Sequence, residues 1–163
     1  MKKIIVIGCP GAGKTTFALR LCEAIGLPLF HLDAIWHKAD RTHISREEFD
    51  SHLGEILSLD EWIIDGNYSR TLERRIASCD TAVLFDLPTE LCLEGAIARL
   101  GSKRPDMPWI DTELDPSFRN EIEVFGREVL PTVYSLLDKY KDGRRIVIFK
   151  SRAEADEWLA SYL

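Results

Sequence analysis

The sequence predicts an α/β protein in which helices cover both faces of a doubly wound parallel sheet. Three observations indicate this three-layer architecture. Short, nearly continuous apolar runs alternate with helical patterns along the chain, as they do in βαβ units with buried strands. The length of 163 residues suits one domain rather than two. Apolar residues form 45% of the chain and charged residues 29%, which is enough apolar material for a substantial core.

Five apolar segments have the composition expected of strands. Several are almost free of polar residues, which is typical of parallel strands covered on both faces. The expected strands lie at residues 3–7, 29–32, 62–65, 82–86 and 145–149.

The predicted helices begin after turns or at recognisable caps. A helical apolar pattern follows Gly13 and ends near Gly26, with a proline just beyond. A serine three residues before a glutamate forms a capping-box pattern, which occurs before two of the other helices. Those other helices are expected at about residues 45–57, 88–100, 118–140 and 151–159. Within the 118–140 pattern, Pro131 predicts a kink or a division into two helices.

Residues 101–116 are predicted to form a lid-type insertion in a single domain that spans residues 1–163. The stretch contains three prolines, which disfavour regular structure. It is the longest candidate for a mobile loop, and long loops in compact domains often carry function.

The most specific motif is GCPGAGKT at residues 8–15, which matches the phosphate-binding pattern G-x-x-x-x-G-K-[ST]. It follows the first strand and opens the first helix, so backbone N–H groups and the positive helix end can face phosphate oxygens. Lys14 is expected to reach the β- and γ-phosphates, and the Thr15 hydroxyl to ligate Mg²⁺. An ordinary glycine-rich turn is the alternative. The predicted nucleotide-binding residues are Gly8, Cys9, Pro10, Gly11, Ala12, Gly13, Lys14, Thr15 and Thr16.

Absent motifs and the charge balance narrow the class of protein. Neither N-K-x-D nor D-x-x-G, both expected of guanine-selective switch proteins, occurs in the sequence. The 21 Lys and Arg residues against 27 Asp and Glu residues give a net charge of −6, which disfavours direct binding to nucleic acid or to anionic membranes. No apolar run approaches the roughly 18 residues of a membrane span. The four cysteines form no C-x-x-C pair, so we expect a reduced, cytoplasmic protein.

Five stretches together resemble the bacterial topology-modulation proteins, a branch of the adenylate-kinase-like P-loop kinases. The stretches are the phosphate loop, HLDAIW at 31–36, WIIDGNYSR at 62–70, RPDM at 104–107, and KYKDG at 139–143 with the strand after it. The resemblance implies ATP binding, a nucleoside- or nucleotide-kinase architecture and the sheet order 2-3-1-4-5. The family name also implies an alternative, a nucleotide-binding regulatory protein that affects DNA topology.

Asp33 and Trp36 are the first candidates for binding the phosphoryl acceptor. Asp33 follows the second strand, at the edge where open α/β sheets bind ligands. In the related kinases an acid at this place contacts the acceptor, and it could accept the hydroxyl proton. A helix cap or a surface carboxylate is the alternative for Asp33. Trp36 can stack on a base or sugar, or be buried in the core.

Gly66 and Arg70 also carry over as acceptor-binding residues by the resemblance. The pair Asp65-Gly66 matches the opening of the adenylate-kinase segment D-G-F-P-R. The residues between Gly66 and Arg70 are one more than in that segment, so Arg74 or Arg75 could take the place of Arg70.

Two aspartates are candidates for the Mg²⁺ site. Asp65 and Asp86 each end an apolar strand, and the pattern alone does not choose between them. The resemblance favours Asp65, which we expect to act together with Thr15.

Arg99 and Arg104 flank the start of the proline-rich stretch. The resemblance implies that lid arginines there stabilise the charge on the transferring phosphoryl group. The expected catalytic residues are Lys14, Asp33, Arg99 and Arg104. Arg119 and Arg127 either contact phosphates or form surface ion pairs, and Trp109 is a packing residue or a lid contact.

The histidines lack metal-ligand spacing and are expected to be structural or solvated. The motifs therefore predict an enzyme that uses ATP and Mg²⁺ to phosphorylate a small molecule, expected from the resemblance to be a nucleoside or nucleotide.

Overall fold

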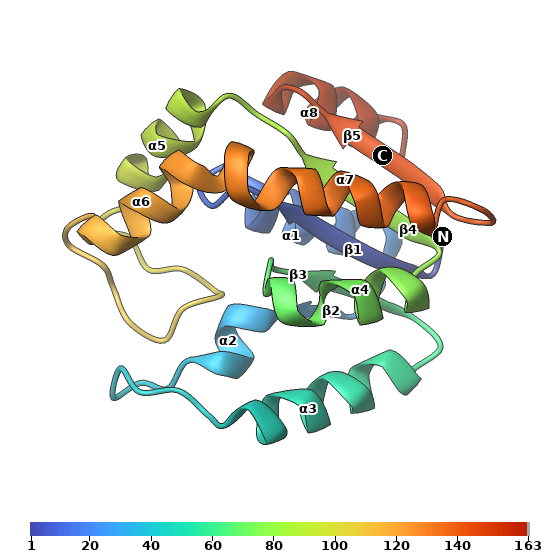
Figure 1. The fold of residues 1–163 in the computed structure, drawn as a ribbon, viewed down its shortest axis with the longest axis horizontal. Coiled ribbons are helices and arrows are strands. Elements are labelled where there is room, and N and C mark those ends of the chain that lie inside the picture. Colours follow the sequence, from blue (N-terminus) through green and yellow to red (C-terminus); the bar gives the residue numbers. More distant parts are fainter. Residues whose placement is uncertain (163) are drawn as a thin grey trace.

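The computed structural model describes residues 1–162 and contains a five-stranded sheet in the order β2-β3-β1-β4-β5 (Figure 1). All neighbouring strands are parallel. The predicted fold class and the implied strand order are therefore confirmed. The strands are β1 (Lys3–Gly8), β2 (Leu29–His31), β3 (Trp62–Asp65), β4 (Thr81–Phe85) and β5 (Arg145–Phe149).

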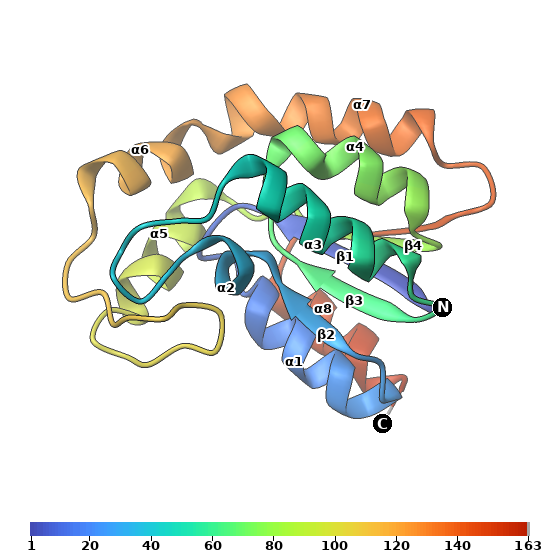
Figure 2. The ribbon, with the colours of Figure 1, turned by 90° about the horizontal axis from the view of Figure 1, so that it is seen from below.

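Helices cover both faces of this sheet, and Figure 2 shows the resulting three layers. The helical elements are α1 (Lys14–Ile25), α2 (Leu32–Trp36), α3 (Arg46–Ser58), α4 (Ser69–Ser78), α5 (Thr89–Ala98), α6 (Pro116–Val124), η1 (Phe125–Val129), α7 (Leu130–Lys139) and α8 (Arg152–Ala160). Both predicted serine caps form, because the side chains of Ser45 and Ser151 accept the backbone N–H groups of Glu48 and Glu154. Among residues 1–162, no helix combines the length and apolar composition that crossing a membrane requires.

The core divides into two clusters, one on each face of the sheet. Ile4 and Val6 of β1 pack into the cluster that includes residues of α1, α5 and α8. Ile5 and Ile7 pack into the cluster that includes residues of α3, α4 and α7. This alternation follows from strand geometry, since successive side chains point to opposite faces. The central strand is thus buried on both sides and holds the phosphate loop at its carboxyl end.

The second strand ends one residue earlier than predicted, and the long helical pattern is divided. Leu32 was expected in the second strand, but it begins α2, where its fully buried side chain packs into the core. Pro131 was expected to kink or divide a helix. The predicted division is confirmed: the π-helical segment η1 separates α6 from α7, and it ends two residues before Pro131, which lies in the first turn of α7. A proline removes one N–H and its ring crowds the carbonyl four residues earlier, and the wider π turn lies at that position.

Residues 101–115 contain no helix or strand. The segment runs from α5 to α6 at the same end of the molecule as α2 (Figures 1 and 2). Asp115 ends it as the N-cap of α6, accepting the N–H groups of Ser117 and Phe118. The segment therefore lies over the carboxyl ends of the strands, where ligands bind in such folds.

We expect Gly95→Ala to destabilise the protein by about 1–3 kcal/mol, because it overpacks the contact between α5 and the phosphate loop. A Cβ atom at Gly95 would lie 2.1 Å from the carbonyl oxygen of Gly11. Gly126→Ala is the matched control, since a Cβ atom there would meet no atom within 4 Å. Urea denaturation measures both free energies of unfolding, and equal stabilities of the two variants would contradict the expectation.

Candidate active site

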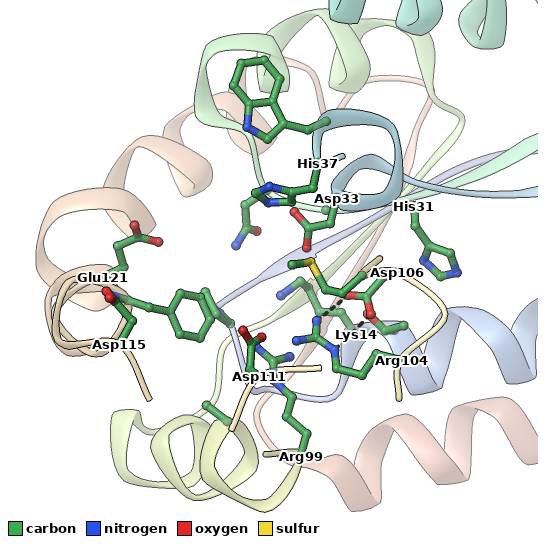
Figure 3. Close-up of a pocket in the computed structure, with 18 of the residues that line it drawn as sticks. Lys14, His31, Asp33, His37, Arg99, Arg104, Asp106, Asp111, Asp115 and Glu121 are labelled. Carbon is green, nitrogen blue, oxygen red and sulfur yellow. Dashed lines mark hydrogen bonds and ion pairs between the residues drawn. The ribbon is translucent and has the colours of Figure 1, made fainter. Parts of the chain in front are cut away.

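A cavity of about 590 Å³ lies at the carboxyl ends of the strands (Figure 3). Its walls come from the phosphate loop, the ends of β2 and β3, α2, the end of α5, the 101–115 segment and the start of α6. Parts of the chain that are far apart in sequence therefore meet around one space.

The phosphate loop is curled by glycines in conformations that other residues rarely adopt. Gly8, Gly11 and Gly13 have φ angles of +142°, +81° and +105°. The first two also lie against neighbouring backbone. A Cβ atom added to Gly8 would lie 2.4 Å from the carbonyl oxygen of Phe85. One added to Gly11 would lie 2.0 Å from the carbonyl oxygen of Cys92. Glycine is therefore required at these positions by both conformation and space.

Lys14 folds back across this loop. Its Nζ donates a hydrogen bond to the carbonyl oxygen of Cys9 at 3.0 Å. Burial lowers the pKa of Lys14, while the nearby Asp65 carboxylate acts in the opposite direction. The side chains of Cys9 and Ala12 are buried and that of Thr16 is exposed, so these three predicted residues have no side chain in the cavity.

The buried Asp65 carboxylate is the best candidate for holding Mg²⁺. Its Oδ2 accepts the hydroxyl of Thr15 at 2.8 Å and lies 3.0 Å from Nδ1 of His31. Its Oδ1 is buried and has no hydrogen-bond partner among residues 1–162. Such an orphaned oxygen costs free energy unless a cation or water satisfies it. Thr15 and Asp65 therefore fit the metal that the sequence predicted for them.

Further ligands for Mg²⁺ would have to come from outside the protein. Within residues 1–162, no group of three or more His, Cys, Asp and Glu side chains is placed to hold a metal ion. This matches the usual binding of Mg²⁺ through one or two protein groups, substrate phosphates and water.

Asp86, the other candidate for the metal, has different partners. Its Oδ2 accepts the hydroxyl of Tyr134 at 2.5 Å and pairs with the ammonium of Lys150. Asp86 does not line the main cavity. The structure therefore brings Asp65 rather than Asp86 to the Thr15 hydroxyl.

Asp33 faces the cavity from α2, and its Oδ1 accepts the hydroxyl of Tyr68 at 2.7 Å. Burial and the Asp33 carboxylate both raise the pKa of Tyr68, so the phenol stays protonated and acts as the donor. Tyr68 has a left-handed backbone with φ of +43°, which is uncommon outside glycine. Tyr68 lies within the 62–70 stretch, but no spacing in the sequence marks it as a partner of Asp33.

The loop that carries Tyr68 is held by Arg75, which is fully buried. The Arg75 guanidinium donates to the carbonyl oxygens of Gly66 at 2.8 Å and Tyr68 at 3.2 Å, and also to that of Asn67. Burial lowers the pKa of Arg75 to about 9. Arg75 therefore shapes the backbone of this loop and presents no guanidinium to the cavity.

Arg70 lies outside the cavity, contrary to its predicted role in binding the acceptor. It forms a two-pronged ion pair with Asp50 of α3 at 2.7 and 2.9 Å, and its side chain is 44% exposed. Arg74 also turns toward α3, donating to the Asp50 carbonyl oxygen at 3.4 Å. The physical reason is that α4 begins at Ser69, so Arg70 lies in the first helical turn and faces α3.

Trp36 and Gly66, which were predicted to bind the acceptor, both line the cavity. The ring of Trp36 stacks on His43 with centroids 4.3 Å apart and packs edge-on against Tyr68. A Cβ atom at Gly66 would lie 2.9 Å from Cβ of Leu32, so the loop passes too close to α2 for a larger residue.

Arg99 and Arg104, the predicted lid arginines, both line the cavity, and Figure 3 shows them on the same side as Lys14, with Asp33 opposite. Arg104 forms a two-pronged ion pair with the buried carboxylate of Asp106 at 3.0 and 2.5 Å. The Arg99 guanidinium lies 5.6 Å from the ring centroid of Phe118. Burial lowers the pKa of Arg99, and the nearby Arg104 adds to this effect.

The other predicted candidates separate into cavity and surface residues. Trp109 lines the cavity, and its ring meets that of His37, the residue after α2, with centroids 5.1 Å apart. Arg119 and Arg127 instead form exposed ion pairs with Glu123 and Glu128. His31 and His37 line the cavity, although histidine spacing gave no reason to expect it.

Arg152, the first residue of α8, is a support of the phosphate loop that the sequence did not reveal. Its Nη2 donates to the carbonyl oxygens of Gly11 at 3.0 Å and Leu91 at 2.9 Å. Its Nε donates to the carbonyl oxygen of Ala12 at 3.3 Å. The loop is therefore tied to α5 and α8 by one side chain.

We expect Arg75→Ala to lower the free energy of unfolding by about 2–4 kcal/mol, because it leaves buried carbonyl oxygens without donors. Arg75→Lys keeps a cation but has no planar fork, so it should recover only part of this loss. Arg74→Ala is the matched control on the same helix, with one long hydrogen bond. Urea denaturation compares the three variants. A loss no larger in Arg75→Ala than in Arg74→Ala would contradict this role.

Comparison with known proteins identifies the fold to which this site belongs. The sequence matches no family model and no curated protein. The structure is similar to a gluconokinase from Sinorhizobium meliloti 1021, with a TM-score of 0.55 at 15% identity over 99% of this chain and 89% of that one.

Two shikimate kinases are equally similar. The one from Bacteroides thetaiotaomicron has a TM-score of 0.55 at 15% identity, over 97% of this chain and 94% of that one. The one from Acinetobacter baumannii, in complex with shikimate, has a TM-score of 0.55 at 17% identity. The match covers 99% of this chain and 90% of that one. The finer resemblance to topology-modulation proteins stays a prediction from the sequence. The chain has the fold of P-loop kinases.

Proposed function

We propose that the protein is a P-loop kinase that transfers the γ-phosphoryl group of ATP to a hydroxyl group of a small molecule. One observation carries this proposal. The phosphate loop with Lys14, the Thr15–Asp65 pair and the Asp33 carboxylate all face one cavity at the carboxyl edge of the sheet. Residues of the types expected to bind the phosphoryl donor, the metal and the acceptor therefore lie around one cavity.

The donor half of the site binds and polarises the triphosphate. The loop backbone, Lys14 and the lid arginines Arg99 and Arg104 supply positive charge where the transferring group spreads its own charge over three oxygens. Thr15 and Asp65 would hold Mg²⁺, which neutralises charge on the β- and γ-phosphates when bound.

The acceptor half orients a hydroxyl group and takes its proton. Asp33 is the candidate base, since its carboxylate lies across the cavity from Lys14 and Arg104 (Figure 3). Tyr68 holds this carboxylate through one oxygen and leaves the other for the acceptor. Trp36 and Gly66 form part of the wall around the acceptor.

The 101–115 segment would keep water from the reaction. Trp109 reaches across to His37, and the Arg41 guanidinium lies 5.2 Å from the centroid of the Trp109 ring. These contacts join the segment to the loop that follows α2, as expected of a lid that closes over a phosphoryl transfer.

The acceptor class rests on two different supports. The names of the structural neighbours indicate that they phosphorylate gluconate and shikimate, which are small hydroxyl compounds. The sequence resemblance instead suggests a nucleoside or nucleotide. A small alcohol is common to both, and we find nothing in residues 1–162 that favours the alternative of a regulator of DNA topology.

We expect Lys14→Ala to lower kcat for phosphoryl transfer by about 10²–10³-fold, because a preorganised cation at the transferring group is lost. Circular dichroism should show an intact fold. Lys141→Ala, which removes an exposed lysine paired with Asp138 outside the cavity, is the control and should keep full activity. Transfer from radiolabelled ATP measures both rates. Unchanged transfer in Lys14→Ala would eliminate the proposed mechanism.

We expect Asp65→Asn to weaken metal binding in the presence of ATP by about 10–100-fold, since the carboxylate lies beside the Thr15 hydroxyl. Asp86→Asn should leave metal affinity unchanged, because the Asp86 carboxylate is paired with Lys150. Titration with Mn²⁺ followed by electron paramagnetic resonance measures this without turnover. Loss of metal affinity in Asp86→Asn but not in Asp65→Asn would assign the metal to Asp86, which follows β4.

A further inference from the structure

The charges around the cavity indicate which alcohols it can accept. We propose that the acceptor carries no anionic group, and that a protonated amine on it favours binding. This inference rests on the proposed function, since it concerns the substrate of the same site. It also separates this protein from its structural neighbours, because gluconate and shikimate are carboxylic acids.

Carboxylates outnumber basic side chains in the cavity lining. Among the described residues, seven carboxylates face three Lys and Arg side chains, and two histidines also line the cavity. The Lys and Arg residues are Lys14, Arg99 and Arg104. The carboxylates are Asp33, Asp65, Asp106, Asp111, Glu113, Asp115 and Glu121. Such a lining attracts cations and repels anions, and low-dielectric walls strengthen the effect.

Two of the three Lys and Arg side chains are already committed to other groups, and the third lies beside them. Lys14 lies in the phosphate loop, where a triphosphate would bind. Arg104 is paired with Asp106, whose carboxylate is only 3% exposed. Arg99 is the remaining cation, and it lies on the same side of the cavity as the other two (Figure 3). A bound triphosphate would use this positive charge and add negative charge of its own.

The arginines nearest the acceptor half offer nothing to an anion. Arg70 and Arg74 turn toward Asp50 on α3. Arg75 uses its guanidinium on the carbonyl oxygens of the 66–68 loop. A carboxylate or phosphate acceptor would ordinarily be held by arginine forks, and none of these three lines the cavity.

The carboxylates of the acceptor half have neutral partners or none. Asp33 accepts from the Tyr68 hydroxyl, and Asp111 from the Trp109 indole at 2.9 Å. Asp115 accepts two backbone N–H groups of α6. Burial raises the pKa of Glu121, and the negative charges of Asp115 and Asp33 act in the same direction. Within residues 1–162 none of these four carboxylates forms an ion pair, so their negative charges add in the cavity, although Arg99 lies near enough for Asp33 and Asp111 to act on its pKa.

Aromatic rings complete the wall and also suit a cation. Trp36, Tyr68, Trp109 and Phe118 line the cavity. Two of these rings already hold guanidinium groups in the protein itself, with Arg41 beside Trp109 and Arg99 beside Phe118. Ring faces attract ammonium groups in the same way. A cationic or neutral alcohol would thus meet favourable groups on several sides.

Two sets of related acceptors, each with a cationic, a neutral and an anionic member, test the inference. One set is glucosamine, glucose and gluconate, and a second is 3′-amino-3′-deoxyadenosine, adenosine and adenosine monophosphate. Transfer of the labelled phosphoryl group from ATP gives kcat/KM for each compound. In the set that serves as substrate, we expect kcat/KM for the amine to exceed that for the anion by at least about tenfold, with the neutral compound between them.

Two carboxylates outside the catalytic set provide the matched variants. Asp111→Asn combined with Glu121→Gln should reduce the preference for the amine over the neutral compound by about threefold or more, as expected from the loss of two nearby charges. Glu123→Gln is the control. It lies on the same helix as Glu121, pairs with Arg119 outside the cavity, and should leave the preference unchanged.

The outcomes separate this inference from the proposed function. A higher kcat/KM for gluconate or adenosine monophosphate than for its uncharged counterpart would overturn the inference while the kinase activity stands. An unchanged amine preference in the double variant would also overturn it. Transfer to no compound in either set, although calorimetry shows ATP binding, would overturn the proposed function together with the inference.

Discussion

The close approach of the phosphate loop to β4 and α5 is the constraint on which the site depends. Gly8 lies against the backbone of Phe85, and Gly11 against that of Cys92, with no room for a side chain at either position. Because both contacts are between main-chain atoms, they fix the loop on the sheet. Lys14 and Thr15 then begin α1 at a defined place, and Thr15 meets Asp65 on the neighbouring strand. Burial of the central strand on both faces supports this geometry.

Each of the two loops at the site is anchored by one arginine. The Arg75 guanidinium donates to carbonyl oxygens of the 66–68 loop. The Arg152 guanidinium donates in the same way to carbonyl oxygens of the phosphate loop. The two loops also touch, since the Gly8 N–H donates to Oδ1 of Asn67 at 3.1 Å. A guanidinium offers several donors in one rigid plane, which suits carbonyl groups that follow one another along a loop. The donor and acceptor halves are therefore built as one frame, with the cavity between them.

Most of the fold could be predicted because its signals are local. Buried strands, serine caps and the glycine-rich motif each occupy a few consecutive residues, and the strand order came from the resemblance rather than from any pattern. The positions of several side chains at the site could not be predicted, because contacts with distant parts of the chain determine them. Arg70 turns to Asp50, Arg75 is buried beneath its own loop, and Tyr68 joins Asp33 across α2. No spacing in the sequence encodes these pairings. The choice between Asp65 and Asp86 likewise depends on partners, since Lys150 lies beside only one of them.

Arg75 anchors the 66–68 loop through backbone carbonyl groups, so the backbone conformation of the loop does not depend on these bonds being made by its side chains. Main-chain carbonyl groups are the same whatever residue carries them, so exchanging a side chain at residue 68 leaves these anchors in place. A new side chain there would appear at the same point above the cavity, on an unchanged scaffold. Natural variation or laboratory selection could therefore alter molecular preference at this loop without rebuilding the surrounding architecture.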